Sequence, residues 1–166
     1  KSAIISNLEK LNFKYVNFSI LQERVSFSFT GEDRVSFLVT FNKGFQPQSL
    51  NEVASGGELS RLLLSIYHFY ATTKSNQLFL FDEIDTGIGG ITANAVGEML
   101  KSISSKNQLI CITHLPQIAL FADSHVLIDK VSTESHTFVS LTKLSESERQ
   151  AEVKRMVGGE FVMAAL

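Results

Sequence analysis

The fold class is decided by a short apolar run that ends in two acidic residues, Leu78-Phe79-Leu80-Phe81-Asp82-Glu83. Four consecutive apolar residues without alternation are typical of a strand that is buried on both faces, as in a parallel sheet. A second run of this kind, Leu109-Ile110-Cys111-Ile112, ends at Thr113-His114, and a helical pattern over residues 91–104 separates the two. This order predicts a right-handed βαβ unit, and therefore an α/β domain with a mainly parallel sheet flanked by helices.

Residues 15–41, upstream of this unit, show a different pattern. Apolar and polar residues alternate there on both sides of the turn-forming segment Thr30-Gly31-Glu32-Asp33. This period of two predicts an amino-terminal β-hairpin with one buried face. Residues 2–11 instead carry apolar side chains at helical spacing, so we expect them to form the last turns of a helix.

The most strongly helical segment lies between the hairpin and the βαβ unit. It opens at Ser55-Gly56-Gly57, and its apolar residues fall on one side of a helix: Leu59, Leu62, Leu63, Ile66, Tyr67 and Tyr70. His68 lies off this stripe, so we expect it to be solvated. Toward the carboxyl end we expect a short helix from Pro116 to about residue 122, strands at 126–128 and 138–141, and a charged helix over 146–157.

Composition and charge indicate an ordinary globular protein. Hydrophobic residues make up 44% and charged residues 19% of the 166 positions, which excludes disordered and collagen-like chains. Lys and Arg number 15 against 17 Asp and Glu, so the net charge of -2 provides no global field for nucleic acid or an anionic membrane. No apolar run approaches the roughly 18 residues of a membrane span. The single Cys111 favours a reducing compartment, and we expect a cytoplasmic location. Because the chain opens at Lys1, we also expect it to be part of a longer polypeptide.

Titratable side chains follow both predicted parallel strands. Asp82-Glu83 ends one strand and Thr113-His114 ends the other, and ligands collect at the carboxyl edge of such sheets. Taken singly, the acidic pair is better explained as a solvated strand end and the histidine as a structural residue. An Asp-Glu pair after four hydrophobic residues has the form of a Walker B strand, in which the Asp holds Mg²⁺ through water and the Glu polarises the attacking water.

A second candidate segment, Ser55-Gly56-Gly57-Glu58, stands at the start of the long helix. Glycines allow backbone N–H groups to approach a ligand closely, and a helix amino terminus favours anions. The simpler interpretation is a serine cap at the beginning of a helix. The helix leads directly into the strand that ends at Asp82-Glu83, and this order favours a shared site.

Three segments in this order resemble the motifs of ABC-type ATPase heads of the SMC class. Residues 53–61 (VASGGELSR) resemble the signature motif, residues 78–88 (LFLFDEIDTGI) the Walker B strand with its D-loop, and residues 112–117 (ITHLPQ) the switch-histidine loop. The flanking residues are most similar to the bacterial members of this class that act in DNA double-strand-break repair and recombination. The resemblance covers most of the chain from about residue 8 onward.

The resemblance implies ATP and Mg²⁺ as cofactors and assigns a role to each motif. Nucleotide held by the opposite head of a dimer is expected to contact Ser55-Gly56-Gly57-Glu58, with Asp85 at the seam between the heads. Asp82 is expected to hold Mg²⁺ through water, Glu83 to act as the catalytic base, and His114 to sense the γ-phosphate.

The chain departs from the family pattern in one major respect, since no G-x-x-x-x-G-K-[ST] segment occurs in it. In SMC-class proteins that Walker A segment belongs to an amino-terminal lobe. The resemblance therefore implies that residues 1–12 end a coiled-coil arm and that residues 13–166 form the carboxy-terminal lobe of the head. Its expected partners are the Walker A lobe of the same polypeptide, a second head in a homodimer, and DNA through the full-length protein near the bacterial nucleoid. We expect no membrane partner, and almost no activity from the lobe alone.

Two other functions stay open. The chain is alternatively a non-catalytic docking and dimerisation module, or Asp82, Glu83 and Asp85 form a carboxylate cluster for metal-dependent phosphodiester cleavage. The cleavage hypothesis gives no role to the signature segment or the switch histidine. Arg61 either contributes to nucleotide or dimer contacts or pairs with Glu58 three residues earlier on the helix.

Overall fold

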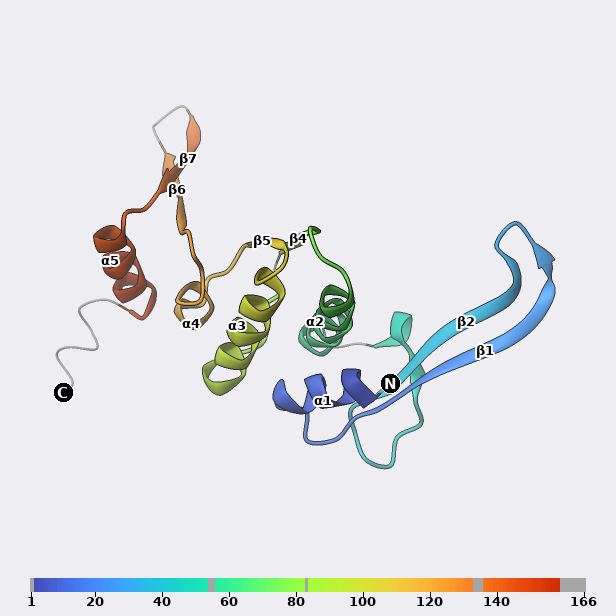
Figure 1. The fold of residues 1–166 in the computed structure, drawn as a ribbon. Coiled ribbons are helices and arrows are strands. Elements are labelled where there is room, and N and C mark those ends of the chain that lie inside the picture. Colours follow the sequence, from blue (N-terminus) through green and yellow to red (C-terminus); the bar gives the residue numbers. More distant parts are fainter. Residues whose placement is uncertain (1, 54–55, 83, 133–135, 159–166) are drawn as a thin grey trace.

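A computed structural model describes residues 2–53, 56–82, 84–132 and 136–158 of the chain. Three helices, α1, α2 and α3, lie next to one another in the middle of the molecule, with a β-hairpin extending on each side (Figure 1). The elements in chain order are α1 (Ser2–Lys10), β1 (Asn17–Ser28), β2 (Gly31–Thr40), β3 (Gln48–Ser49), a single 3-10 turn (Leu50–Glu52), α2 (Gly56–Thr73), β4 (Leu78–Phe81), α3 (Gly90–Ser104), β5 (Gln108–Cys111), α4 (Pro116–Ala119), β6 (Val126–Ser132), β7 (Thr137–Lys143) and α5 (Glu146–Met156).

The predicted βαβ unit is present. Strands β4 and β5 pair in parallel, with Leu78 opposite Gln108 and Phe81 opposite Cys111, and α3 connects them. One face of this pair packs on α2, where the ring of Tyr67 meets Phe81 edge to face with 5.9 Å between ring centroids. A parallel pair joined by a crossover helix is the arrangement that the two unbroken apolar runs favour.

The prediction of a mainly parallel sheet is wrong for the rest of the described strands. Strands β1, β2 and β3 form an antiparallel sheet, and β6 and β7 form a separate antiparallel pair. Only four residues separate Ser132 from Thr137, and so short a connection cannot carry the chain back to the start of a parallel neighbour. The parallel pairing is therefore confined to β4 and β5 within the described part of the chain.

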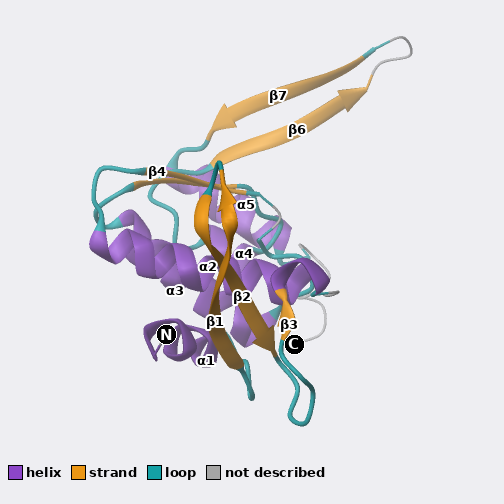
Figure 2. Cartoon of the chain, turned by 90° about the vertical axis from the view of Figure 1, so that its right-hand side faces the viewer, coloured by secondary structure: helices purple, strands orange, loops and turns teal. Residues whose placement is uncertain are grey.

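The first hairpin forms as predicted, but most of its apolar face is uncovered. Near its base Phe18 and Val39 are fully buried, whereas Phe27 near the tip is 82% exposed. The two views show why: β1 and β2 extend away from the helices in Figure 1 and stand in front of them in Figure 2, so only their base reaches the core. The alternation in the sequence identifies the apolar face of the hairpin. Within the described residues, only the base of that face is covered by other elements.

The core lies among α1, α2 and α3. Buried apolar side chains from the three helices and the adjoining loops fill it, including Leu8, Leu11, Leu62, Leu64, Val96, Leu100 and Ile103. The apolar stripe predicted for α2 is only partly correct, because Leu63, Tyr67 and Tyr70 remain substantially exposed while Leu64 and Ser65 are buried. Helix α2 packs against both α1 and α3, so its buried surface is wider than one stripe and includes polar positions. None of the described helices is long and apolar enough to cross a membrane.

Candidate functional site

The carboxyl ends of β4 and β5 lie beside each other, as the sequence predicts. The ladder continues past the last paired residues, since the N–H of Ile112 donates to the carbonyl of Phe81 at 2.9 Å. Asp82 follows β4 directly and is exposed, and Thr113 and His114 follow β5. This edge therefore presents a carboxylate and an imidazole from adjacent strands. Glu83, the predicted catalytic base, lies outside the described residues.

Asp85 joins these two strand ends. Its side chain is 3% exposed, and its Oδ2 atom accepts hydrogen bonds from the Thr113 hydroxyl at 2.5 Å and from the backbone N–H of His114 at 2.9 Å. Nδ1 of His114 lies 3.0 Å from the same oxygen. The carboxylate thus accepts the Nδ1 proton, and Nε2 is left at the outer end of an imidazole that is 72% exposed.

The structure shows a contact of Asp85 that the sequence did not indicate. Its carboxylate is turned inward and holds the switch loop, and the place of the residue at a seam between two heads stays a prediction. Thr86 and Gly87, which follow Asp85 in the turn, are exposed. No pattern in the sequence indicates the contact of Asp85 with Thr113 and His114, because donors at a strand end can also be satisfied by water.

The start of α2 touches this turn. A Cβ atom on Gly57 would lie 2.7 Å from the backbone oxygen of Thr86, closer than real Cβ atoms come, so only glycine allows the contact. A Cβ on Gly56 would meet no atom within 4 Å, so the first turn of the helix is open on that side. The first N–H groups of an α-helix have no partner within it, and they attract anions. Glu58 lies half-buried in this turn, and Ser55 lies outside the described residues.

Arg61, the last residue of the signature segment, lies one turn further along α2 than Gly57. Its guanidinium carbon lies 4.6 Å from the centre of the Phe13 ring, a cation–π arrangement. Burial lowers the pKa of Arg61, while the charge of Glu58 acts in the opposite direction. Arg61 therefore interacts electrostatically with Glu58, which is one of the two interpretations from the sequence. It also packs against Phe13 in the segment after α1, which neither interpretation included.

Cys111, at the end of β5, is unreactive. Burial, followed by the negative charges of Asp85 and Asp82, raises the pKa of its thiol to about 12. The thiol is therefore fully protonated at neutral pH.

Among the residues that the structure describes, no three His, Cys, Asp or Glu side chains gather closely enough to hold a metal ion. Because Asp85 is already committed to the switch loop, it is not available for the carboxylate cluster that phosphodiester cleavage would need.

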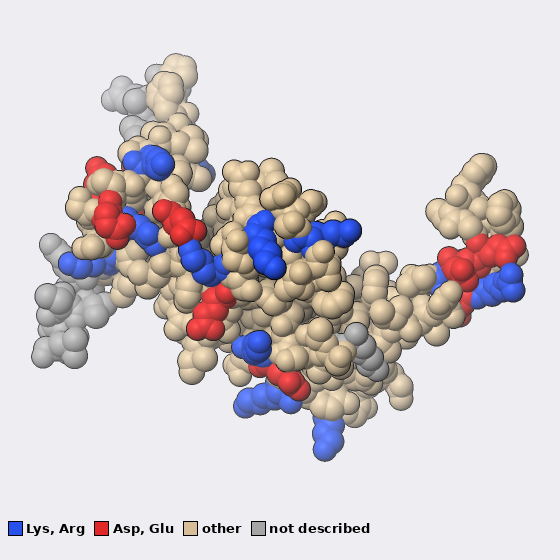
Figure 3. Space-filling model, in the orientation of Figure 1, with Lys and Arg blue, Asp and Glu red and all other residues tan. Residues whose placement is uncertain are grey.

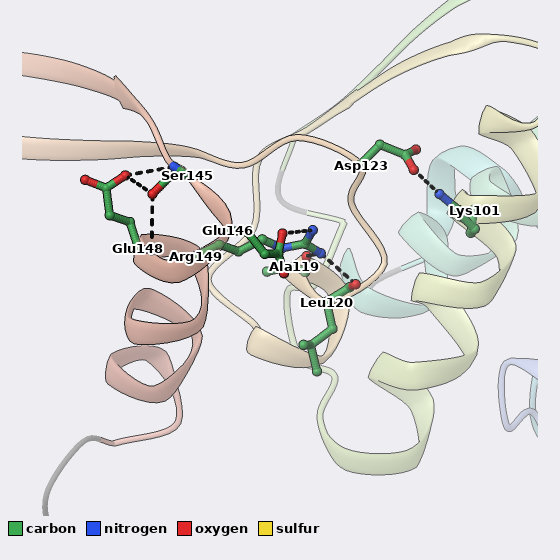
Figure 4. A network of polar contacts seen from close by, with 8 residues as sticks. All are labelled: Lys101, Ala119, Leu120, Asp123, Ser145, Glu146, Glu148 and Arg149. Atoms are coloured by element: carbon green, nitrogen blue, oxygen red, sulfur yellow. Dashed lines mark hydrogen bonds and ion pairs between the residues drawn. The ribbon is translucent and has the colours of Figure 1, made fainter.

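A polar network downstream fixes the helix that follows the switch loop. Arg149 of α5 donates to the carbonyls of Ala119 and Leu120, at 3.2 and 2.8 Å, at the carboxyl end of α4 (Figure 4). Lys101 of α3 forms an ion pair with Asp123 just beyond that point. Short helix α4 begins at Pro116, two residues after His114, so both contacts help to hold the segment that carries the histidine.

Comparison with known proteins agrees with this geometry. No model of a known protein family matches the chain. The chain is 40% identical over 158 residues to the DNA repair protein RecN of Rickettsia bellii, covering 95% of this chain and 28% of the relative, and 42% identical over 129 residues to RecN of Bacillus subtilis, covering 78% and 22%. The chain thus spans about a quarter of the length of these curated relatives. The sequence-based expectation of a bacterial DNA repair relative is confirmed.

Solved structures of SMC heads share the fold. The Smc head domain with a coiled coil and joint from Pyrococcus yayanosii superposes with a TM-score of 0.64 at 21% identity, over 93% of this chain and 29% of that one. A chain from a study of ATP-driven dimerisation and DNA-stimulated activation of SMC ATPases superposes with a TM-score of 0.57 at 19% identity, over 96% of this chain and 94% of that one. The expected fold class, a lobe of an SMC-type head, is therefore confirmed.

Proposed function

The chain belongs, over the segment that it spans, to the family of the DNA repair protein RecN, and we propose that it is the carboxy-terminal lobe of an ATPase head that acts in DNA double-strand-break repair. In this proposal the lobe forms part of a site that binds and hydrolyses ATP. A second lobe and a second head supply the rest of that site. The isolated lobe is inactive because the chain has no Walker A segment.

One observation carries the proposal: the signature, D-loop and switch-histidine segments form a continuous line of contacts. Gly57 lies against Thr86, the neighbouring Asp85 holds Thr113 and His114, and Asp82 stands beside them at the sheet edge. These segments are far apart in the sequence, and no packing requirement of the core brings a helix start, an acidic strand end and an exposed imidazole to one edge. A site for a charged ligand does.

The residues at this edge fit nucleotide and Mg²⁺. Gly56 and Gly57 offer an open helix amino terminus to a phosphate group, and Ser55 precedes them. Asp82 is an exposed oxygen ligand of the kind that Mg²⁺ prefers, and it would hold the ion through water. When bound, Mg²⁺ neutralises charge on the phosphates. Glu83 follows Asp82 and would orient the attacking water.

His114 supplies the remaining group. With Nδ1 donating to Asp85, its Nε2 atom faces outward and can contact the γ-phosphate oxygen of a nucleotide. Asp85 acts through the histidine, because it fixes the ring orientation and the position of the proton.

The Walker A lobe is the partner that this chain's uncovered surfaces fit. Parallel strands are normally covered on both faces, yet Leu78 and Leu80 of β4 are 63% and 66% exposed. Among the described strands, β4 pairs only with β5, and Tyr67, Tyr70 and the whole of β4 line a shallow groove. Apolar patches of this kind mark interaction sites. A lobe that contributes further strands beside β4 would complete the sheet.

The same surfaces also support the second candidate, a docking and dimerisation module without catalysis. The two functions differ in nucleotide affinity. In the catalytic proposal the chain and its Walker A lobe together bind ATP and respond to changes at Glu83. In the docking function the lobes form a stable complex, but this chain adds nothing to nucleotide affinity or to ATP turnover, so a change at Glu83 has no effect on either.

DNA contact is assigned to the rest of the protein. The net charge is -2, and on the face shown in Figure 3 basic and acidic side chains are interspersed without a continuous basic band. Backbone recognition of DNA needs clustered Lys and Arg. We place the assembled head in the bacterial cytoplasm, at the nucleoid.

The test is steady-state ATP hydrolysis by the full-length protein, wild type beside Glu83→Gln, with and without linear DNA. Loss of hydrolysis with retained ATP binding supports the composite ATPase, and Glu23→Gln, at an exposed position on β1, serves as a matched control. Equal hydrolysis in wild type and Glu83→Gln would refute the catalytic assignment and favour the docking module.

A further inference from the structure

A series of side-chain hydrogen bonds links the three central helices α1, α2 and α3, at a distance from the candidate site. Asn7 of α1 is only 7% exposed, and its Nδ2 atom lies 3.1 Å from Nδ1 of His68 on α2 and 3.4 Å from the backbone oxygen of Ser65. Nε2 of His68 lies 3.1 Å from the hydroxyl of Ser102 on α3. His68 was expected to be solvated, but it is half-buried and contacts both neighbouring helices.

The direction of these hydrogen bonds follows from their partners. The Ser65 carbonyl can only accept, so the Asn7 atom that faces it is the amide nitrogen, a donor. The same nitrogen donates to Nδ1 of His68, which therefore carries no proton. The proton lies on Nε2 and is donated to the Ser102 hydroxyl. A doubly protonated ring would direct an N–H at the Asn7 amide donor and lose that bond.

Burial and the charge of Lys10 also favour the neutral ring. Burial is the main cause that lowers the pKa of His68, and Lys10 of α1 lowers it further. On α3, Glu98 lies one turn before Ser102, and Lys101 is paired with Asp123. Between residue 62 and its end at Thr73, α2 carries no charged side chain besides His68 itself.

We propose that His68 is a positioning residue that fastens α1 to α2 and α3 through its neutral Nε2–H form. Helices α2 and α3 both begin at the edge that holds the candidate site, at Gly56 and Gly90. Fastened in this way, α1 moves as one body with the starts of those helices. If the head functions as proposed above, the residue couples the arm that ends in α1 to the nucleotide site, and this part alone rests on the proposed function.

The first measurement is backbone amide exchange of α1 in the full-length protein. His68→Leu removes both side-chain hydrogen bonds, so α1 amides should exchange about tenfold faster than in wild type. His68→Gln has an amide oxygen and nitrogen with which to replace the two bonds, so it should restore most of the protection. Ser102→Ala should give an intermediate loss, and Ser104→Ala, which removes a hydroxyl that donates to the Lys101 carbonyl, should give none.

The second measurement is the ¹⁵N NMR spectrum of the His68 ring as a function of pH. We expect the Nε2–H form at neutral pH. As the pH falls below the ordinary histidine value of about 6.5, the ring gains a proton more easily when α1 is released, so α1 protection should fall in wild type and not in His68→Gln. An Nδ1–H ring, or equal exchange in His68→Leu and wild type, would overturn the proposal.

The two proposals fail separately. If the full-length protein does not hydrolyse ATP, the ATPase proposal fails, while amide exchange and the NMR spectrum still judge His68. If exchange is unaffected by His68→Leu while hydrolysis is normal, only the positioning role is refuted. A circular dichroism spectrum identical to that of wild type shows that a faster exchange in α1 is local.

Discussion

The carboxylate of Asp85 and the imidazole of His114 form a pair that joins the interior of the protein to its surface, with Oδ2 and Nδ1 3.0 Å apart. The carboxylate is buried, the ring is exposed, and the same oxygen also accepts from the backbone N–H of His114 and the hydroxyl of Thr113. The loop that carries this exposed side chain is thus held by three hydrogen bonds to one buried oxygen, one of them from the ring itself. The switch histidine is oriented before any ligand arrives, which lowers the cost of ordering it on binding.

Asp85→Asn tests this pair. The substituted amide keeps the shape but removes the charge and presents a donor where Asp85 accepts, so we expect His114 to lose its fixed orientation and proton position. ATP hydrolysis by the full-length protein should fall about tenfold or more, because small misplacements of a reacting group are costly. The ¹⁵N spectrum of the ring should change from the Nδ1–H form to a mixture. Asp33→Asn, at an exposed position of β2, should leave both properties unchanged.

Gly57→Ala and Gly56→Ala form a matched pair at the start of α2. The Cβ on residue 57 would lie 2.7 Å from the Thr86 oxygen and must displace the turn, whereas the Cβ on residue 56 meets nothing within 4 Å. We expect Gly57→Ala to change the amide NMR shifts of residues 85–88 and to destabilise the protein by about 1–3 kcal/mol. Gly56→Ala should leave those shifts unchanged. Similar spectra for both variants would contradict the close contact.

Gly97→Ala tests the packing of α3 against the segment after α4. A Cβ at this position would lie 2.3 Å from the ring of Phe121, so the ring must move or α3 must shift. Overpacking of this kind costs about 1–3 kcal/mol, which should lower the urea midpoint of unfolding. Asn94→Ala, at an exposed position of the same helix, is the control and should keep the wild-type midpoint. An unchanged midpoint in Gly97→Ala would show that Phe121 is free to rearrange.

Arg149→Met tests the attachment of α5 to α4. Methionine keeps most of the apolar stem but loses the hydrogen bonds to the Ala119 and Leu120 carbonyls. Hydrogen bonds that involve a charged group contribute about 1.5–3 kcal/mol each, and one of these two is exposed to solvent, so we expect a loss of about 2 kcal/mol in unfolding experiments. Lys154→Met on the exposed side of α5 should change stability by less than about 0.5 kcal/mol. If Arg149→Met and Lys154→Met were equally stable, the hydrogen bonds from Arg149 to α4 would make no measurable contribution to stability.

Cys111 gives a prediction for alkaline pH. Its pKa of about 12 in the folded protein lies above that of an unfolded cysteine, about 8.5, so the folded state retains the proton longer. This contribution to stability is complete below pH 8.5 and is lost as the pH rises toward 12. Cys111→Ser should therefore lose stability less steeply between pH 9 and 11. In native wild type, iodoacetamide should not label the thiol at pH 8, and rapid labelling there would contradict the raised pKa.

Much of the fold could be predicted because the chain's local patterns are strong. The unbroken apolar runs at 78–81 and 109–112 predicted β4 and β5 to within one residue, and Ser145 caps α5 with the reciprocal Ser145 and Glu148 hydrogen bonds of a capping box. Each of these features depends on neighbours in the sequence, so they can be recognised without knowledge of the tertiary structure.

The antiparallel pairing of the remaining strands and the exposure of the hairpin could not be predicted from local patterns. Periodicity shows which face of β1 and β2 is apolar, but whether that face is covered depends on what lies opposite, and beyond the base of the hairpin nothing in the described chain does. The position of His68 was missed for a related reason. A polar residue off an apolar stripe is solvated only if no second helix packs there, and α1 does.

The sequence by itself determined the motifs, their order and the strand ends that carry them, because hydrophobic period and glycine placement are local properties. Only the tertiary structure decided what Asp85 does. Whether a carboxylate faces outward to a ligand or inward to a neighbour depends on the path of the adjacent strand, and here β5 brings the Thr113 and His114 donors within 3.0 Å of it. Three donors converging on one oxygen hold the carboxylate inside, where burial strengthens each of those bonds.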